Sequence, residues 1–256
     1  MDTAALLASW QQEAQRPFAG WDFAYLDGRK LAEAPPPVEY PQRVVQLMAR
    51  ARSVLDLDTG GGELLLTFRP HWPAIVVATE GYAPNVRVAT DRLAPPGVQV
   101  VEHPSEETAP LPFGDATFDL VLNRHGGAMN ITEIARILNL GGSFLTQQVH
   151  GQTLIDMLTL FGATPQWPDA TPAHYLPWIA RAGLDLIDVQ EYTGAEIFVD
   201  VGALVYFLTA IPWLVPGFSV ATHAEPLLQL HARILQGERL RFTTRRYFIE
   251  ARKPIG

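Results

Sequence analysis

Apolar positions along the chain follow two spacings from residue 41 onward, one typical of amphipathic helices and one typical of buried strands. Short apolar runs predict strands at 53–58, 74–80, 98–103, 118–123 and 142–149. Helical spacing predicts helices at 41–52, 84–94 and 129–140, and the pair Gly141-Gly142 is expected to stop the last of them. Strands that alternate with helices in this way predict βαβ units and a parallel sheet.

Two further strands are expected late in the chain, at 184–192 and 241–252. The second is long and alternates apolar with polar residues, which suits an antiparallel strand at the edge of a sheet. The predicted fold is therefore α/β, a doubly wound Rossmann-like sheet that is mostly parallel and has an antiparallel last strand.

An N-terminal helical cap is predicted for residues 1–40, ahead of a main domain at 41–256. The cap is rich in aromatic side chains, and its proline run at 35–37 forbids helix and favours an extended connector. An apolar insertion is expected in the main domain, around 193–236. The cap is expected to pack on, or over, the domain that follows it.

The insertion contains an apolar run at 197–215 that is long enough to be weighed as a membrane span. Asp200 and Pro212 interrupt this run, and no basic flank follows it. A buried helix or an apolar cap is therefore favoured, and no membrane association is expected.

Composition narrows the classes of function. The chain has 256 residues, a net charge of -8 and no cysteine. An acidic surface disfavours nucleic acid as a partner, and the absence of cysteine excludes disulfides, thiolate metal sites and cysteine nucleophiles. The histidines show no paired metal spacing, so no metal is expected. The N-terminus has no signal-peptide pattern, so a cytoplasmic location is expected. A monomer and a homodimer both remain open.

The segment 54–63, VLDLDTGGGE, lies at the first strand-to-helix turn, where doubly wound sheets bind ligands. Its glycines allow close approach of the backbone to a ligand, and acids flank them. The residues concerned are Asp56, Asp58, Gly60, Gly61, Gly62 and Glu63. Leu65 stands where a dinucleotide-binding loop has its third glycine, no P-loop Lys-Ser/Thr pair follows, and the acids would repel a pyrophosphate. A cationic cofactor without phosphate suits this loop better.

At this point the sequence resembles the class I S-adenosylmethionine-dependent methyltransferases, whose first motif has the form D-x-G-x-G-x-G. Asp56, Gly60 and Gly62 match that motif, whereas Asp58 replaces its first glycine. The resemblance implies S-adenosylmethionine as the cofactor. It also implies that Asp58 lies near the methionine moiety, where it would offer a carboxylate to the ammonium group.

The resemblance implies further cofactor contacts. Glu80 ends the strand expected at 74–80, where the family has an acid that accepts hydrogen bonds from both ribose hydroxyls. Glu106 is the candidate adenine contact, with an acidic surface loop as the equal alternative. Asn123 opens the segment 123–127, NRHGG, which faces the transferring methyl group in the family.

His125 is the candidate catalytic base, because the ordinary pKa of histidine suits proton transfer from a hydroxyl or amine acceptor. The alternative is a hydrogen-bonded histidine that shapes the pocket. His150, after the next strand, is a second candidate on the same side of the sheet.

The aromatic residues of the cap and insertion favour a small, partly apolar acceptor that is methylated at O or N. Three alternatives stay open: an rRNA or tRNA methyltransferase, an NAD-dependent oxidoreductase, and a protein that binds S-adenosylmethionine without catalysis. The RNA alternative depends on a C-terminal basic cluster formed by Arg233, Arg239, Arg241, Arg245, Arg246, Arg252 and Lys253.

Overall fold

The computed structural model describes residues 2–18, 21–34 and 39–256. The strands are β1 (Lys30–Ala32), β2 (Ser53–Leu57), β3 (Ile75–Glu80), β4 (Gln99–Glu102), β5 (Phe118–Arg124), β6 (Leu138–Val149), β7 (Asp185–Phe198) and β8 (Leu240–Arg252). The helices are α1 (Thr3–Ala14), α2 (Tyr40–Met48), α3 (Glu63–Thr67), α4 (Ala83–Leu93), α5 (Ile131–Ile137), α6 (Ile155–Leu160), α7 (Pro172–Arg181), α8 (Val201–Ala210) and α9 (Ala224–Leu235).

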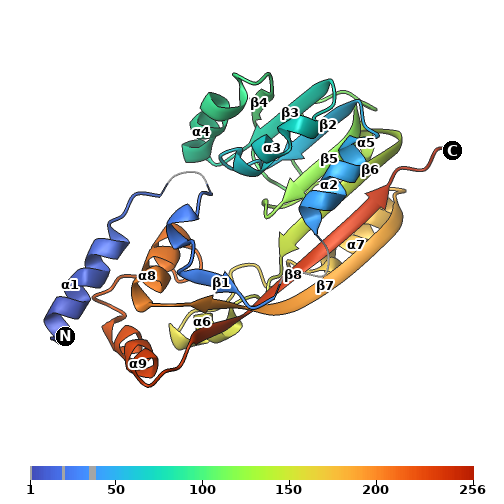
Figure 1. The fold of residues 1–256 in the computed structure, drawn as a ribbon. Helices are drawn as coiled ribbons and strands as arrows, with labels where there is room; N and C mark the ends of the chain where they lie inside the picture. The colour runs from blue at the N-terminus through green and yellow to red at the C-terminus, as the bar shows by residue number, and fades with distance from the viewer. Residues whose placement is uncertain (1, 19–20, 35–38) are drawn as a thin grey trace.

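The strands form one eight-stranded sheet in the order β1-β7-β8-β6-β5-β2-β3-β4 (Figure 1). Neighbours from β4 through β6 pair in parallel, and β8 is antiparallel to both β6 and β7. The predicted doubly wound sheet with an antiparallel last strand is confirmed.

The expectation that the last strand lies at the sheet edge is wrong. Strand β8 pairs on both sides, and the outer edge beyond it is formed by β7 and the short β1. The physical reason lies in the second half of β8, where Tyr247, Phe248, Ile249, Glu250 and Ala251 are all buried. Burial of consecutive residues requires cover on both faces, which an interior strand receives.

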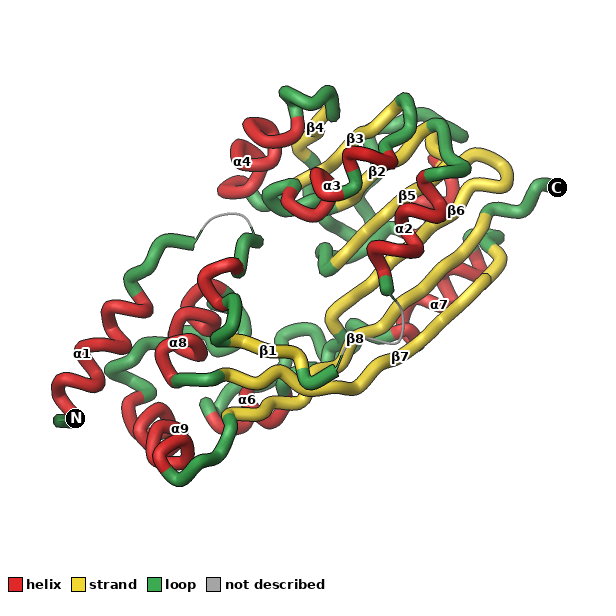
Figure 2. The backbone as a smooth tube through the Cα atoms, in the orientation of Figure 1, coloured by secondary structure: helices red, strands yellow, loops and turns green. Residues whose placement is uncertain are grey.

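Helices cover both faces of the parallel part of the sheet (Figure 2). Successive strand residues point to opposite faces, so Val54 packs with α2, α3 and α4, whereas Leu55 packs with α5 and α7. This part of the molecule, from β4 to β6 with its five helices, is called the sheet half below.

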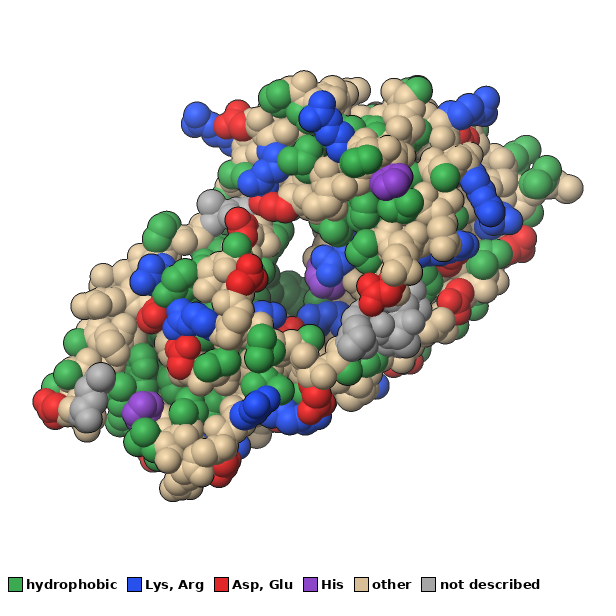
Figure 3. Space-filling view, viewed as in Figure 1, with side chains coloured by type: hydrophobic (Ala, Val, Ile, Leu, Met, Phe, Trp, Pro, Cys, Tyr) green, Lys and Arg blue, Asp and Glu red, His purple; other side chains and the backbone are tan. Residues whose placement is uncertain are grey.

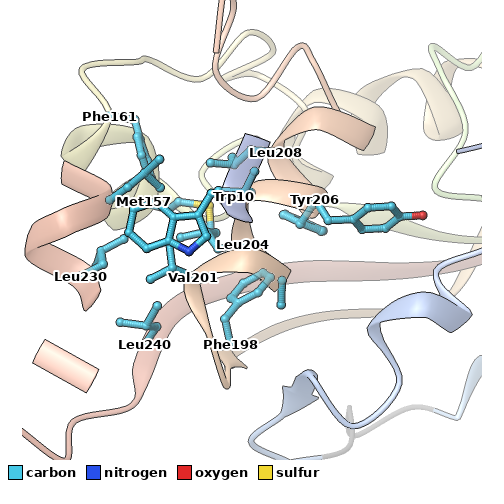
Figure 4. Close-up of a cluster of buried hydrophobic side chains, with 14 of the residues drawn as sticks. Trp10, Met157, Phe161, Phe198, Val201, Leu204, Tyr206, Leu208, Leu230 and Leu240 are labelled. Carbon is cyan, nitrogen blue, oxygen red and sulfur yellow. The ribbon is translucent and has the colours of Figure 1, made fainter. Parts of the chain in front are cut away.

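A second half, called the cap half, consists of α1, β1, α6, α8 and α9 with the adjoining ends of β7 and β8 (Figures 1 and 2). It has its own hydrophobic cluster, in which Trp10 from α1 lies among Met157, Phe161, Leu204 and Leu230 (Figure 4). Residues expected to form the N-terminal cap thus pack against residues of the expected insertion.

Strand β7 continues to Phe198, well into the segment where the insertion was expected to begin. The apolar run that follows contains α8, and Asp200 is the N-cap residue of this helix. Its carboxylate accepts from the backbone N–H of Ala203 (2.8 Å) and pairs with Arg29 (2.6 Å). Among the residues that the structure describes, no helix combines the length and apolarity that crossing a bilayer requires.

Helix α5 ends at Ile137, three residues before the end that the glycine pair predicts. Leu138 is fully buried and pairs with Phe118, so it already belongs to β6. Gly141, at φ +78°, lies in the irregular stretch where the pairing of β6 with β5 shifts register. The glycines therefore accommodate a bulge inside a strand and do not stop the helix.

Candidate cofactor and acceptor site

The candidate site lies at the carboxyl ends of β2, β3 and β5. Strand β2 pairs with β3 on one side and with β5 on the other, so the strand order reverses beside it. Open α/β sheets form their ligand crevice at such a switch point. The glycine loop follows β2, Glu80 ends β3, and the segment 123–127 includes the end of β5.

The glycine loop requires glycine for two reasons. Gly60 and Gly62 have φ of +65° and +79°, in the left-handed region that other residues rarely adopt. A Cβ atom on Gly60 would lie 2.4 Å from the Trp21 ring, and one on Gly62 would lie 2.6 Å from Leu93. Gly61 contributes its carbonyl oxygen, which accepts from Arg92 of α4. Trp21 thus brings the cap half into direct contact with the glycine loop.

Asp58 adopts a left-handed conformation (φ +56°) and turns its carboxylate toward neighbouring loops. The carboxylate accepts from the Ser105 hydroxyl, from the Asn123 amide (3.3 Å) and from the backbone N–H of Gly127 (3.0 Å). Burial raises the pKa of Asp58, and these three hydrogen bonds oppose the rise. The residue therefore links the three loops that surround the crevice.

Glu80 is buried at the end of β3, with 5% of its surface exposed. Its Oε1 accepts from the backbone N–H of Tyr82 (2.7 Å), and the backbone N–H groups of Gly60 and Gly81 also donate to the carboxylate. Burial raises the pKa of Glu80 above its ordinary range. The carboxylate is thus fixed beside the glycine loop.

Asn123 is fully buried in the wall of the crevice. Its amide donates to the Leu57 carbonyl (3.0 Å) as well as to Asp58, and its oxygen accepts from Gln148. A small pocket adjoins it, lined by Asp58, His103, Ser105, Glu106, Asn123 and Met129, among others. Glu106 itself is exposed.

Asp56, near the end of β2, has a pKa raised to about 7 by burial and by the negative charges of Asp58 and Glu80. Since the ordinary pKa of an aspartate is 3.8, the folded state binds more protons than the unfolded state between these two values. The contribution of Asp56 to stability is therefore expected to fall as the pH rises from about 4 to 7.

The substitution Asp56→Asn should remove this dependence. Between pH 4 and 7 the variant should lose less unfolding free energy than the wild type, by roughly 2–4 kcal/mol. Urea unfolding curves at several pH values measure the difference. Parallel pH profiles for the two proteins would contradict the raised pKa of Asp56.

A deep cleft separates the cap half from the sheet half, and basic and histidine side chains lie within it (Figure 3). His125 has φ +54°, donates its backbone N–H to Gln147 (2.9 Å) and keeps a solvent-accessible side chain. The surrounding protein, and then the charges of Arg124, Arg246 and Lys30, lower the pKa of His125 well below its usual range. The imidazole is therefore neutral at pH 7.

His150 occupies a different position. It is buried, its Nδ1 accepts from the backbone N–H of Gln152 (3.0 Å), and its ring meets that of Tyr247 edge-on. Tyr247 and Arg246 are consecutive in β8 and so face opposite sides of the sheet. His150 thus packs on the side of the sheet opposite to Arg246.

Several residues of the site were missed in the sequence: Trp21, Lys30, Ser105, Arg124 and Arg246. Arg124 had a local signal, because it stands beside His125 at the end of a strand. Arg246 was counted in the C-terminal basic cluster, but that cluster does not form one strip. Arg241 pairs with Glu33 (2.7 Å), Arg245 contacts Gln152, and Arg246 lies on the other face of β8.

This sheet order, with a glycine loop after β2 and a buried acid at the end of β3, is the fold of the class I S-adenosylmethionine-dependent methyltransferases. YcgJ of Bacillus subtilis superposes with a TM-score of 0.59 at 18% identity, over 85% of this chain and 99% of its own. BH2331 of Bacillus halodurans, a candidate methyltransferase, gives 0.58 at 18% identity, over 84% and 97%. The [4+2]-cyclase SpnF gives 0.52 at 17% identity, over 99% and 93%.

Comparison with protein-family models gives no match, and comparison with curated proteins gives none either. At 17–18% identity, the structural likeness shows the fold alone. The fold also serves a [4+2]-cyclase, so the activity of this chain has to be argued from its own site.

Proposed function

We propose that the protein binds S-adenosylmethionine at the switch point and transfers its methyl group to an O or N atom of a small, partly apolar molecule. The observation that carries this proposal is the buried Glu80 carboxylate, fixed by backbone N–H groups beside the glycine loop. A carboxylate has about four acceptor sites, and with three of them taken by backbone N–H groups one remains for a ribose hydroxyl. The glycines leave room for close approach, and the loop sequence 54–63 itself contains no lysine or arginine.

The other residues of the crevice fit the same cofactor. Asp58, and Asp56 once it is ionised, would supply negative charge to its ammonium and sulfonium groups. Glu106, at the edge of the small pocket beside Ser105 and Met129, would contact the adenine amino group. When bound, the cofactor supplies a methyl group already activated on sulfur, so the protein has mainly to position and desolvate the acceptor.

His125 is the group proposed to receive the acceptor's proton. Its neutral imidazole lies in the cleft, at the end of β5, and its lowered pKa leaves it unprotonated at physiological pH. Trp21 and Trp213, whose rings are 5.4 Å apart, would give the acceptor an apolar surface near the glycine loop.

Calorimetric titrations of the purified chain with S-adenosylmethionine, S-adenosylhomocysteine and NAD test the proposal. Micromolar binding of the first two, with no heat from NAD, is the expected result. Binding of NAD alone would assign the glycine loop to an oxidoreductase. Binding of S-adenosylmethionine without methyl transfer to any acceptor in a broad screen would favour the non-catalytic alternative.

The substitution Glu80→Ala should weaken S-adenosylmethionine binding by about 1.5–3 kcal/mol, because hydrogen bonds to an ionised group are lost. Glu102→Ala is the matched control, since Glu102 pairs in register with Glu80 on the next strand but is exposed. The control should bind the cofactor as the wild type does. Equal affinity of the wild type and Glu80→Ala would remove the ribose role.

A further inference from the structure

Three basic side chains converge between the two halves of the molecule. Arg124 of β5 donates to Gln147 of β6 (3.0 Å), and Gln147 is paired across the sheet with Phe248 of β8. Cross-strand partners share a face, and Arg246 lies two residues before Phe248 on that same face. Lys30 of β1 joins them through Glu196 of β7, which contacts both Lys30 and Arg246.

Positive charge exceeds negative charge at this place. Glu196 Oε1 lies 3.2 Å from Lys30 Nζ and 3.3 Å from Arg246 Nη2, so a single carboxylate oxygen serves two cations. Arg124 contacts the neutral Gln147 and lies over the Tyr40 ring at 6.0 Å. Within the part of the chain that the structure describes, Arg124 has no carboxylate at salt-bridge distance. This local excess of positive charge is opposite in sign to the net charge of the chain, which is -8.

The three cations are only partly accessible to water. The side chains of Arg246 and Lys30 are 24% and 23% exposed, and all three lie close enough to His125 to lower its pKa. Half-buried cations that lack full pairing favour an anionic ligand, and a guanidinium offers several donors to a carboxylate or phosphate.

We propose that the methyl acceptor carries an anionic group, a carboxylate or a phosphate, which Arg246, Arg124 and Lys30 bind. This inference rests on the proposed function and specifies the acceptor further. The anionic group would lie on the sheet surface between the two halves, and the apolar body would lie toward Trp21 and Trp213. His125, at the end of the same strand as Arg124, would then be near the methyl-accepting atom.

Titration of the full chain with phenylacetate, phenyl phosphate and the neutral phenylacetamide tests the charge requirement, with and without saturating S-adenosylhomocysteine. At least one anion should bind at least about 10-fold more tightly than the amide. Preference between the two anions distinguishes a carboxylate site from a phosphate site. Absence of binding by both anions, or equal binding of the amide, overturns the proposal.

Two substitutions of opposite expected effect locate the site. Arg246→Gln should weaken anion binding by about 10- to 100-fold, since it removes a charge-assisted contact. Glu196→Gln should strengthen it, because the competing carboxylate is lost, and damage to the fold would not produce that gain. Arg241→Gln removes the same charge from an exposed residue and should leave anion binding unchanged. Thermal unfolding checks that each variant is folded.

The cofactor's own carboxylate is the competing occupant. If Arg246→Gln weakens S-adenosylmethionine binding and leaves anion binding unchanged, the cations belong to the cofactor and the proposal is wrong. The titrations without cofactor keep the two questions apart, because they give an answer even if S-adenosylmethionine does not bind.

Discussion

Replacing Trp10 with alanine is expected to lower the free energy of unfolding by about 3–5 kcal/mol. Trp10 is 4% exposed and lies at the centre of the cap-half cluster, between side chains of α6, α8 and α9 (Figure 4). Its ring also meets His231 edge-on at 5.8 Å. The loss combines the transfer of a large apolar side chain with the cavity that remains. Urea unfolding with equilibrium fluorescence measures it.

Trp178→Ala is the matched control, because Trp178 is 44% exposed on α7 in the sheet half. It should cost less than about 1 kcal/mol. If Trp10→Ala lowered the free energy of unfolding as little as Trp178→Ala does, α1 would not be part of the cooperative fold. Two separate unfolding transitions in Trp10→Ala would show that the two halves unfold independently.

The second large effect concerns the ion pair that joins α2 to β8. Arg43 contacts both carboxylate oxygens of Glu250 (2.7 and 2.6 Å), and Glu250 is 2% exposed. Arg43→Met should cost about 3 kcal/mol, since it leaves a buried carboxylate without its partner. Arg43 is itself partly exposed, so the lower end of the range for buried pairs applies.

The double variant Arg43→Met with Glu250→Gln should recover much of that loss, because no buried charge remains. Arg87→Met supplies the control, as the Arg87–Asp91 pair is exposed and should contribute less than about 1 kcal/mol. Melting temperatures of the four proteins measure these differences. A double variant no more stable than Arg43→Met alone would contradict the role of the unpaired carboxylate.

Local patterns in the sequence were sufficient to predict the strands of the parallel part of the sheet. Each strand from β2 to β5 is a short apolar run bounded by loop residues, and α4 has regular apolar spacing, whereas the short helix α3 between β2 and β3 was not predicted. The glycine loop and Glu80 could be found for the same reason, since each stands at the end of such a run. Their spacing along the chain depends on a single βα unit.

Contacts between residues far apart in the chain could not be predicted from such local patterns. The position of β8 between β6 and β7 depends on pairing partners 42 to 109 residues away in the chain. Asp58 could be recognised as a departure from the family motif, but its three donors come from the loop after β4, from the end of β5 and from the loop that follows β5. The grouping of Lys30 with Arg246 likewise requires that β1 be added beyond β7.

The glycine pair after α5 shows a different limit. Gly141-Gly142 suits a helix end and a strand bulge equally well, because both need a left-handed residue. Burial of Leu138 against the sheet decides between the two, and burial is a property of the assembled core.

Strands β7 and β8 run without a break from the sheet half into the cap half, paired with each other from Asp185 to Phe198. The two halves therefore share this pair of antiparallel strands, and the cap cannot be exchanged between proteins as a separate module without cutting both strands. A hinge at this place would also have to bend a continuous antiparallel ladder. We therefore expect the width of the acceptor cleft to be set when the chain folds, and acceptor preference to diverge through substitutions on its walls.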